Sequence, residues 1–72
     1  MRGNFFYKRL GLRVIVERKK NNLSQEQLAL QSCVDRTYLA RIEEGKANPT
    51  IKVLNKIAKT LKIRLFKLLK GV

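Results

Sequence analysis

The chain contains no histidine and only one cysteine, Cys33, among its 72 residues. A lone cysteine cannot form an intramolecular disulfide, and a structural zinc site needs several cysteine or histidine ligands. We interpret Cys33 as a small buried apolar residue in a reducing cytosol rather than as a reactive thiol. A domain of this length buries a limited core. Self-association is therefore the expected additional source of stability.

Acidic residues are also scarce. Five Asp and Glu residues face seventeen Lys and Arg residues, which gives a formal net charge of +12. All five acids lie between residues 17 and 44, and the segment from Gly45 onward carries eight basic residues and no acid. Such a field attracts polyanions, and both nucleic acid and an anionic membrane fit it.

Long apolar runs are absent. No stretch approaches the roughly 18 to 20 apolar residues that a membrane span needs, and the N-terminus lacks the features of a signal peptide. We therefore expect a soluble, cytoplasmic protein. Catalytic patterns are missing too: there are no paired carboxylates, no nucleophile arranged with a base and no glycine-rich phosphate loop. We expect no enzyme activity, no cofactor, no metal and no small-molecule ligand.

The hydrophobic pattern predicts five helices, and hence an all-α fold in a single domain of residues 1–72. Apolar and polar residues nowhere alternate between turn dipeptides, so no strand is expected. The first helix is expected from about Tyr7 to Asn21, after an N-terminal arm of residues 1–6. Leu10, Val14 and Arg18 recur on one face of this helix.

Three further apolar residues of the first helix lie outside that face: Leu12, Ile15 and Val16. Either this helix is contacted from two sides or one of these residues is exposed.

Residues 24–44 read as two short helices joined by a tight turn. Ser24 followed by Gln27 is the signature of a capping box, and Asp35 is suited to cap the second of these helices. A fourth helix is expected after Thr50, with its apolar face formed by Leu54, Ile57, Ala58 and Leu61. A short fifth helix is expected at about Arg64 to Lys70, presenting Leu65, Leu68 and Leu69.

One face of the helix after Asp35 can read DNA bases. At about 100° per residue, Arg36, Thr37 and Arg41 share an outward arc around the small Ala40. Leu39 and Ile42 point the other way, into the core. Arginine donates two hydrogen bonds to guanine, and the threonine methyl can contact thymine. A solvated surface face is the plain alternative, because exposed helix positions commonly carry these residues.

Two segments carry a resemblance to a known family: Leu23 to Ala29, with the sequence LSQEQLA, and Val34 to Gly45, with VDRTYLARIEEG. Asn48-Pro49-Thr50 and the apolar residues of the fourth helix continue the pattern. The chain resembles the phage-repressor and Cro-type (XRE-like) helix-turn-helix family from about Leu10 to Leu69. The resemblance implies a lambda-repressor-like five-helix domain, encoded by a prokaryote or phage, that binds double-stranded operator DNA as a homodimer to regulate transcription.

The resemblance also assigns site residues by position. It places a phosphate contact, and a brace for the base-reading side chains, at Gln25. It implies base contacts and backbone contacts for two further sets of residues: Arg36, Thr37 and Arg41 for bases, and Tyr38, Lys46 and Asn48 for the sugar-phosphate backbone. Packing at the helix edge is an equally good interpretation of Tyr38. Arg18 and Glu43 match a structural ion pair between the first and third helices, and removing one partner of such a pair is costly.

Some positions depart from the family pattern. Cys33 and Lys62 stand where glycine is usual, and a non-glycine residue there implies strain or an altered turn. Phe66 stands where a polar residue is usual, so Leu65, Phe66 and Leu69 are a candidate dimer interface. Compact controller proteins of restriction-modification systems dimerise in this way, and the chain resembles them in size.

Other functions remain as alternatives. A structured-RNA binder has the same charge requirement, and a membrane-active cationic peptide fits the lysine-rich last two helices. An antitoxin-type autorepressor that also binds a protein partner belongs to the same family.

Overall fold

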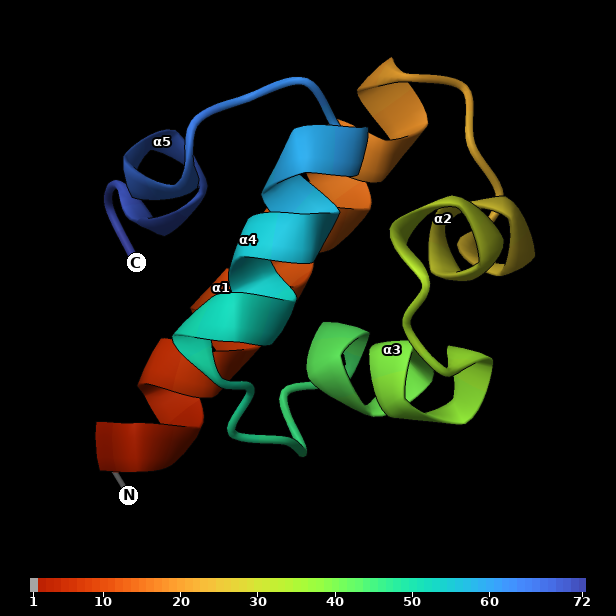
Figure 1. Ribbon diagram of the computed structural model, residues 1–72. Helices are drawn as coiled ribbons and strands as arrows, with labels where there is room; N and C mark the ends of the chain where they lie inside the picture. The colour runs from red at the N-terminus through yellow and green to blue at the C-terminus, as the bar shows by residue number, and fades with distance from the viewer. Residues whose placement is uncertain (1) are drawn as a thin grey trace.

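The computed structural model describes residues 2–72, and five helices account for most of them (Figure 1). They are α1 (Arg2–Lys20), α2 (Gln25–Ser32), α3 (Arg36–Glu43), α4 (Ile51–Thr60) and α5 (Leu65–Leu69). No strand occurs in this part of the chain. The all-α, five-helix prediction is therefore confirmed. None of these helices is long and apolar enough to cross a membrane.

The expected N-terminal arm is wrong for residues 2–6, which belong to α1; residue 1 lies outside the described residues. Residues 2–6 contain no proline. A helix whose next turns are already fixed in the core extends by one backbone hydrogen bond per added residue. Extension is therefore favoured over a separate arm.

Side-chain caps begin three of the helices where the sequence predicted them. Ser24 and Gln27 form the capping box at α2, with Ser24 Oγ accepting from the Gln27 amide at 3.0 Å and Gln27 Oε1 accepting from the Ser24 amide at 2.7 Å. Asp35 accepts from the Tyr38 amide at 3.1 Å, and Thr50 from the Val53 amide at 3.2 Å. Helix α5 has no such cap, since the side chain of Arg64 makes no cap hydrogen bond.

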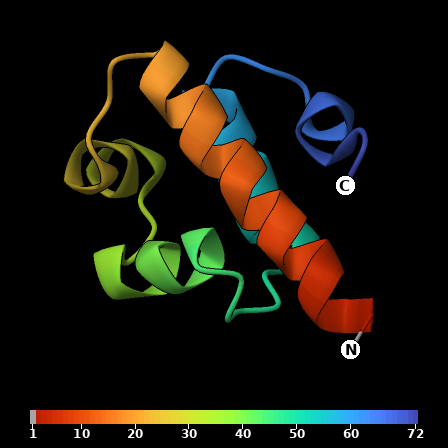
Figure 2. The same ribbon diagram turned by 180° about the vertical axis from the view of Figure 1, so that it is seen from behind.

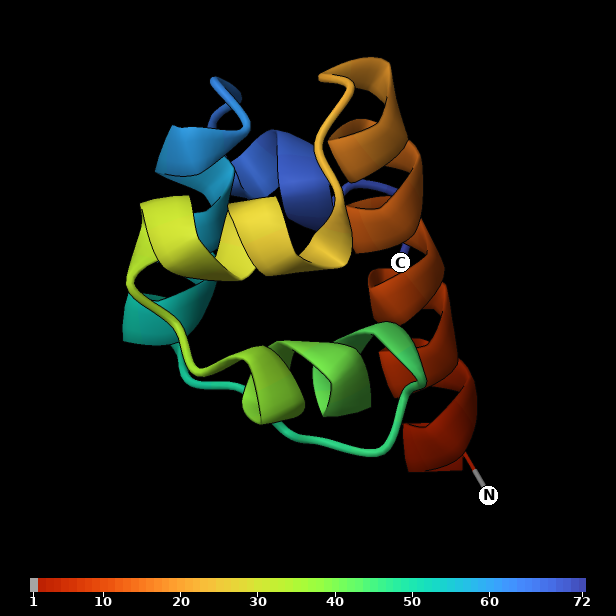
Figure 3. The ribbon, with the colours of Figure 1, turned by 90° about the vertical axis from the view of Figure 1, so that its right-hand side faces the viewer.

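Helices α1 and α4 form two opposite walls of the domain. They overlap in the view of Figure 1 but stand apart in Figure 3. Helix α3 packs on α1 and α2, and α2 packs on α4. On the other side, α5 contacts both α1 and α4. Figure 2 shows α5 on the opposite side of α1 from α2 and α3. The helix pair α2–α3 and the short α5 therefore close the core from two sides.

All five helices contribute apolar side chains to the core, together with the turn between α2 and α3. Its buried members are Leu10, Val14, Leu28, Ala29, Val34, Leu39, Ile42, Leu54, Ile57, Ala58, Leu61 and Leu68. Leu65 and Leu69 are only partly buried and pack against its edge. Of the three apolar residues of α1 that lie outside its buried face, Leu12 and Val16 are exposed and Ile15 is half-buried.

Gly11 sets the close approach of α1 to α3. A Cβ at this position would overlap the backbone carbonyl oxygens of Ile42 and Glu43, the second only 2.5 Å away. Glycine inside a helix is unfavourable by roughly 0.5–1 kcal/mol relative to alanine. Here the missing side chain lets the end of α3 lie directly on α1.

Cys33 is exposed, so its interpretation as a buried residue is wrong. It follows the last turn of α2 with φ 58°, in the left-handed region expected for a glycine position. The side chains of the neighbouring Ser32 and Val34 are buried, whereas the Cys33 side chain points into solvent. Lys62 adopts a similar conformation after α4, with φ 62°.

Candidate nucleic-acid interface

Helices α2 and α3 are joined by three residues, 33–35, and pack on each other. Leu28 and Ala29 of α2 and Leu39 and Ile42 of α3 are buried in the shared core. Val34 in the turn is buried with them. The orientation of α3 is therefore fixed by packing on its inner face, and its outer face is free to meet a ligand.

The outer face of α3 carries the residues expected to read bases. Arg36, Thr37 and Arg41 are exposed, and Ala40 between them is half-buried. The structure thus brings the two arginines and the threonine onto one surface around a small centre. The guanidinium of Arg41 makes a hydrogen bond within the chain: its Nη2 donates to the carbonyl oxygen of Lys46 at 3.0 Å.

Tyr38 has a mixed environment. Its side chain is half-buried and packs against the edge of the core. The packing interpretation therefore accounts for part of this side chain, while the rest remains accessible beside the outer face of α3.

The loop after α3 carries Lys46 and Asn48, and both side chains are exposed. Its geometry starts at Gly45, whose φ of 77° suits glycine and whose backbone lies against Lys8 of α1. The amide of Lys46 donates to the carbonyl oxygen of Arg41 at 2.8 Å, which ties the loop to the last turn of α3. The Lys46 ammonium lies 3.9 Å from Glu44, but both side chains are exposed and such pairs contribute little.

A buried ion pair holds α3 to the rest of the domain. Arg18 of α1 donates to both carboxylate oxygens of Glu43, from Nε at 2.8 Å and from Nη2 at 3.1 Å. Its remaining Nη1 donates to the carbonyl oxygen of Leu23 at 3.0 Å. This bidentate geometry is the strong form of a charge-assisted pair, and the two side chains are only 13% and 4% exposed.

Gln25 belongs to this network. Its Nε2 donates to Glu43 Oε1 at 3.0 Å. The resemblance had assigned Gln25 a phosphate contact and a bracing role towards the base-reading side chains. In this structure its amide braces Glu43, so one carboxylate links α1, α2 and α3.

The expected dimer residues do not form one exposed patch. Phe66 is 66% exposed, whereas Leu65 and Leu69 pack against the core. Sequence reasoning also missed Glu17, which is buried and lies 3.5 Å from both Arg13 and Lys20. Its signal was visible in the sequence, since Arg13 and Lys20 stand four and three residues away on the same helix.

Comparisons with known proteins agree with this geometry. A model of the helix-turn-helix family HTH_3 matches residues 16–68. Control protein C.MunI from Mycoplasma sp. is 40% identical over 57 residues, which cover 79% of this chain and 77% of that protein. The transcriptional regulator SlrR from Bacillus subtilis is 37% identical over 60 residues, or 82% of this chain, but the match spans only 40% of SlrR.

Among solved structures, the restriction-modification controller protein C.AhdI from Aeromonas hydrophila superposes with a TM-score of 0.84. It is 34% identical, and the match covers 86% of this chain and 94% of that one. The expected resemblance to repressor- and controller-type proteins is confirmed by these matches. The chain belongs to the helix-turn-helix family.

Proposed function

We propose that this protein binds double-stranded operator DNA in a sequence-specific manner and regulates transcription. The observation that carries the proposal is the exposed set of Arg36, Thr37 and Arg41 on a helix whose inner face is fixed in the core. A helix of this kind enters the major groove with its outer face towards the base edges. The two arginines then donate to guanine, and Thr37 contacts a thymine methyl or a phosphate.

Phosphate contacts complete the interface in this proposal. Lys46 and Asn48 are exposed in the loop after α3, and Tyr38 is half-buried at its edge. Contacts of this type fix the register of the protein on the duplex but carry no sequence information. Gln25 acts indirectly here, because its amide supports Glu43 and so the position of α3.

The functional unit in this proposal is a homodimer on a palindromic site. One chain presents one reading helix, and two such helices match two half-sites about one helical turn, roughly 34 Å, apart. Phe66 supports the dimer surface because it is a large apolar side chain left in solvent on α5.

Selection from a pool of random duplexes tests the proposal. The expected result is an enriched palindrome that binds two chains and outcompetes random DNA by a factor of about 10³ or more. A pool that emerges without any preferred sequence would contradict it. Competition with duplex RNA distinguishes DNA binding from RNA binding. If RNA displaces the bound duplex more strongly than the selected DNA does, an RNA-binding role is favoured.

A further inference from the structure

The outward face of α1 carries an apolar stripe that the core does not use. Phe5, Leu12 and Val16 are 63%, 60% and 47% exposed. At about 100° per residue these three side chains lie within about 40° of one another, on the side of the helix away from Leu10 and Val14. In Figure 2 no other helix passes in front of α1. We call these three residues the outer stripe.

Basic side chains border the outer stripe on both edges. Arg9 and Arg13 lie along one edge, and Lys8 and Lys19 along the other, by the same helical spacing. The only acid of α1, Glu17, is buried and lies beside Arg13 and Lys20. The stripe therefore combines apolar contact area with cations that no exposed carboxylate of α1 neutralises.

The spacing is that of a helix-pairing seam. Residues 5, 9, 12, 16 and 19 follow one another at alternating steps of four and three along α1. This is the repeat by which one helix packs its side chains along another. Arg9 and Lys19 occupy two of these positions at the edges of the outer stripe, and charges that flank such a seam set the choice of partner.

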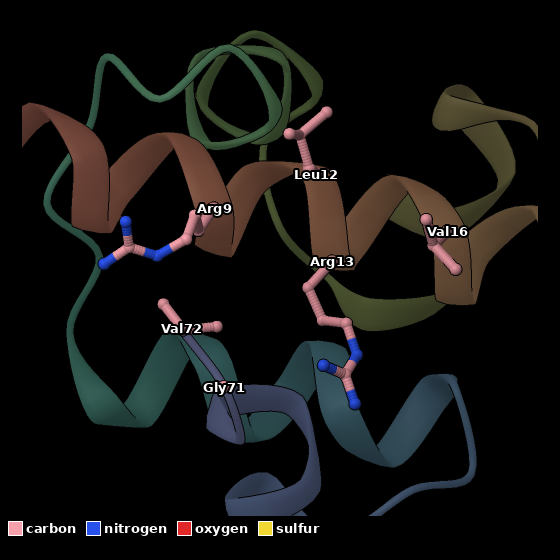
Figure 4. Close-up of a pocket in the computed structure, with 6 residues that line it drawn as sticks. All are labelled: Arg9, Leu12, Arg13, Val16, Gly71 and Val72. Atoms are coloured by element: carbon pink, nitrogen blue, oxygen red, sulfur yellow. The ribbon is translucent and has the colours of Figure 1, made fainter.

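A pocket of about 270 Å³ lies at the Arg9 and Arg13 edge of the outer stripe. Leu12, Val16, Gly71 and Val72 complete its lining, and Figure 4 shows the Val72 side chain between the two guanidinium groups in that view. Arg13 is held in place, because its Nη1 donates to the Lys70 carbonyl at 2.9 Å and its Nε lies 3.5 Å from Glu17. Arg9 is exposed at the rim.

We propose that the outer stripe docks an acidic amphipathic helix of a partner protein. Apolar side chains of that helix cover Phe5, Leu12 and Val16, and one of them enters the pocket. Its carboxylates meet Arg9, Lys8 and Lys19. A second copy of this chain is the poorer occupant, since pairing α1 with α1 would set these cations against each other.

This surface is separate from the reading face. Helix α3 rests on α1 through Gly11, about 120° around the helix from the stripe. The docked helix therefore leaves Arg36, Thr37 and Arg41 open. The proposal does not depend on DNA binding.

The test uses the full chain and a synthetic, fluorescein-labelled peptide about three heptads long, with leucine at its seam positions and glutamate at the flanking positions. Fluorescence anisotropy measures its Kd. Leu12→Asp should weaken binding about tenfold or more, and Arg9→Gln about three- to fivefold. The control Lys59→Gln removes the same charge from the exposed face of α4 and should change Kd by less than about twofold. Circular dichroism checks that each variant is folded, with Leu12→Gln as a milder second substitution.

Three results would overturn the proposal. Equal losses in Arg9→Gln and Lys59→Gln, with no loss in Leu12→Asp, mean that net charge alone attracts the peptide. Equal affinity for a scrambled peptide of the same composition means that binding does not depend on the spacing of the leucines along the helix. Sedimentation that shifts from dimer to monomer in the Leu12→Asp variant means that a second copy covers the stripe.

Discussion

The carboxylate of Glu43 accepts from the guanidinium of Arg18 at both oxygens, across 25 residues of sequence. It also accepts from Gln25, so the last residue of α3 is tied to both α1 and α2. A carboxylate with this many donors is satisfied in spite of its burial. Helix α3 is thereby anchored at its end, in addition to the packing of its inner face.

Removing either partner of this pair should destabilise the domain. Arg18→Ala and Glu43→Ala are each expected to lower the free energy of unfolding by about 3 to 5 kcal/mol, because an uncompensated charge stays buried. Thermal unfolding of both single variants and the double variant gives the coupling energy. Additive losses would show that the contact contributes nothing of its own. Base preference of the variants that stay folded should change less than their stability does.

Gly11→Ala should destabilise the protein by about 1 to 3 kcal/mol. Alanine is the better helix former, but its Cβ would meet the carbonyl oxygens of Ile42 and Glu43, which are backbone atoms. Denaturant unfolding measures the change. Lys19→Ala, at an exposed position of the same helix, is the matched control and should stay within about 0.5 kcal/mol of the parent. A stabilised Gly11→Ala variant would mean that α3 can shift away from α1 at little cost.

The two arginines of α3 should behave differently from the loop lysine. Arg36→Ala and Arg41→Ala are expected to cost about 1 to 3 kcal/mol on the selected site and to relax preference at particular base pairs. Titration against single-base variants of that site measures this. If either substitution weakens selected and random DNA equally, the residue is a phosphate contact.

Lys46→Ala should weaken binding to all duplexes alike and lower the salt slope by about one. The reason is its place in the loop beyond the C-terminal end of α3. Titrations at several salt concentrations measure the slope. Lys59→Ala, on the outer face of α4, is the control for the loss of one positive charge. An altered base preference in the Lys46 variant would argue against a phosphate role.

Phe66→Glu should weaken dimerisation and DNA binding together while each subunit remains helical. The side chain is 66% exposed, so the substitution leaves the core intact. Analytical ultracentrifugation with and without DNA measures association, and circular dichroism measures helix content. Phe66→Leu, which keeps an apolar side chain, serves as control. A Phe66→Glu variant that dimerises normally would place the dimer contact elsewhere.

Local signals in the sequence predicted most of the fold. Ser24, Asp35 and Thr50 begin their helices because each has a suitable side chain at the right distance from a free amide. The apolar spacing of α4 predicted its buried face for the same local reason. The start of α1 was missed, since helix extension into residues 2–6 leaves no start signal of this kind.

Features that depend on packing between distant segments were harder to predict. Gly11 carries no sign in the sequence that α3 will lie on it. The exposure of Cys33 follows from Ser32 and Val34 filling the interior places beside it. Leu65, Phe66 and Leu69 are all large apolar residues. Only the position of α5 against the core shows that the two leucines pack on it and that Phe66 is exposed. The role of Gln25 likewise depends on Glu43, eighteen residues away.

In the proposed complex, the hydrogen bond from Arg41 to the Lys46 carbonyl oxygen competes with any contact that Arg41 makes to a base. Any base that Arg41 contacts must offer a better acceptor than this carbonyl. Guanine meets that demand because its O6 and N7 accept two hydrogen bonds from one guanidinium, whereas a single acceptor only replaces the bond that is lost. On random sequence the arginine can therefore remain folded back on its own loop. The hydrogen bond in the free chain therefore lowers the affinity gained from the Arg41 contact on every sequence, because it must break before the contact forms.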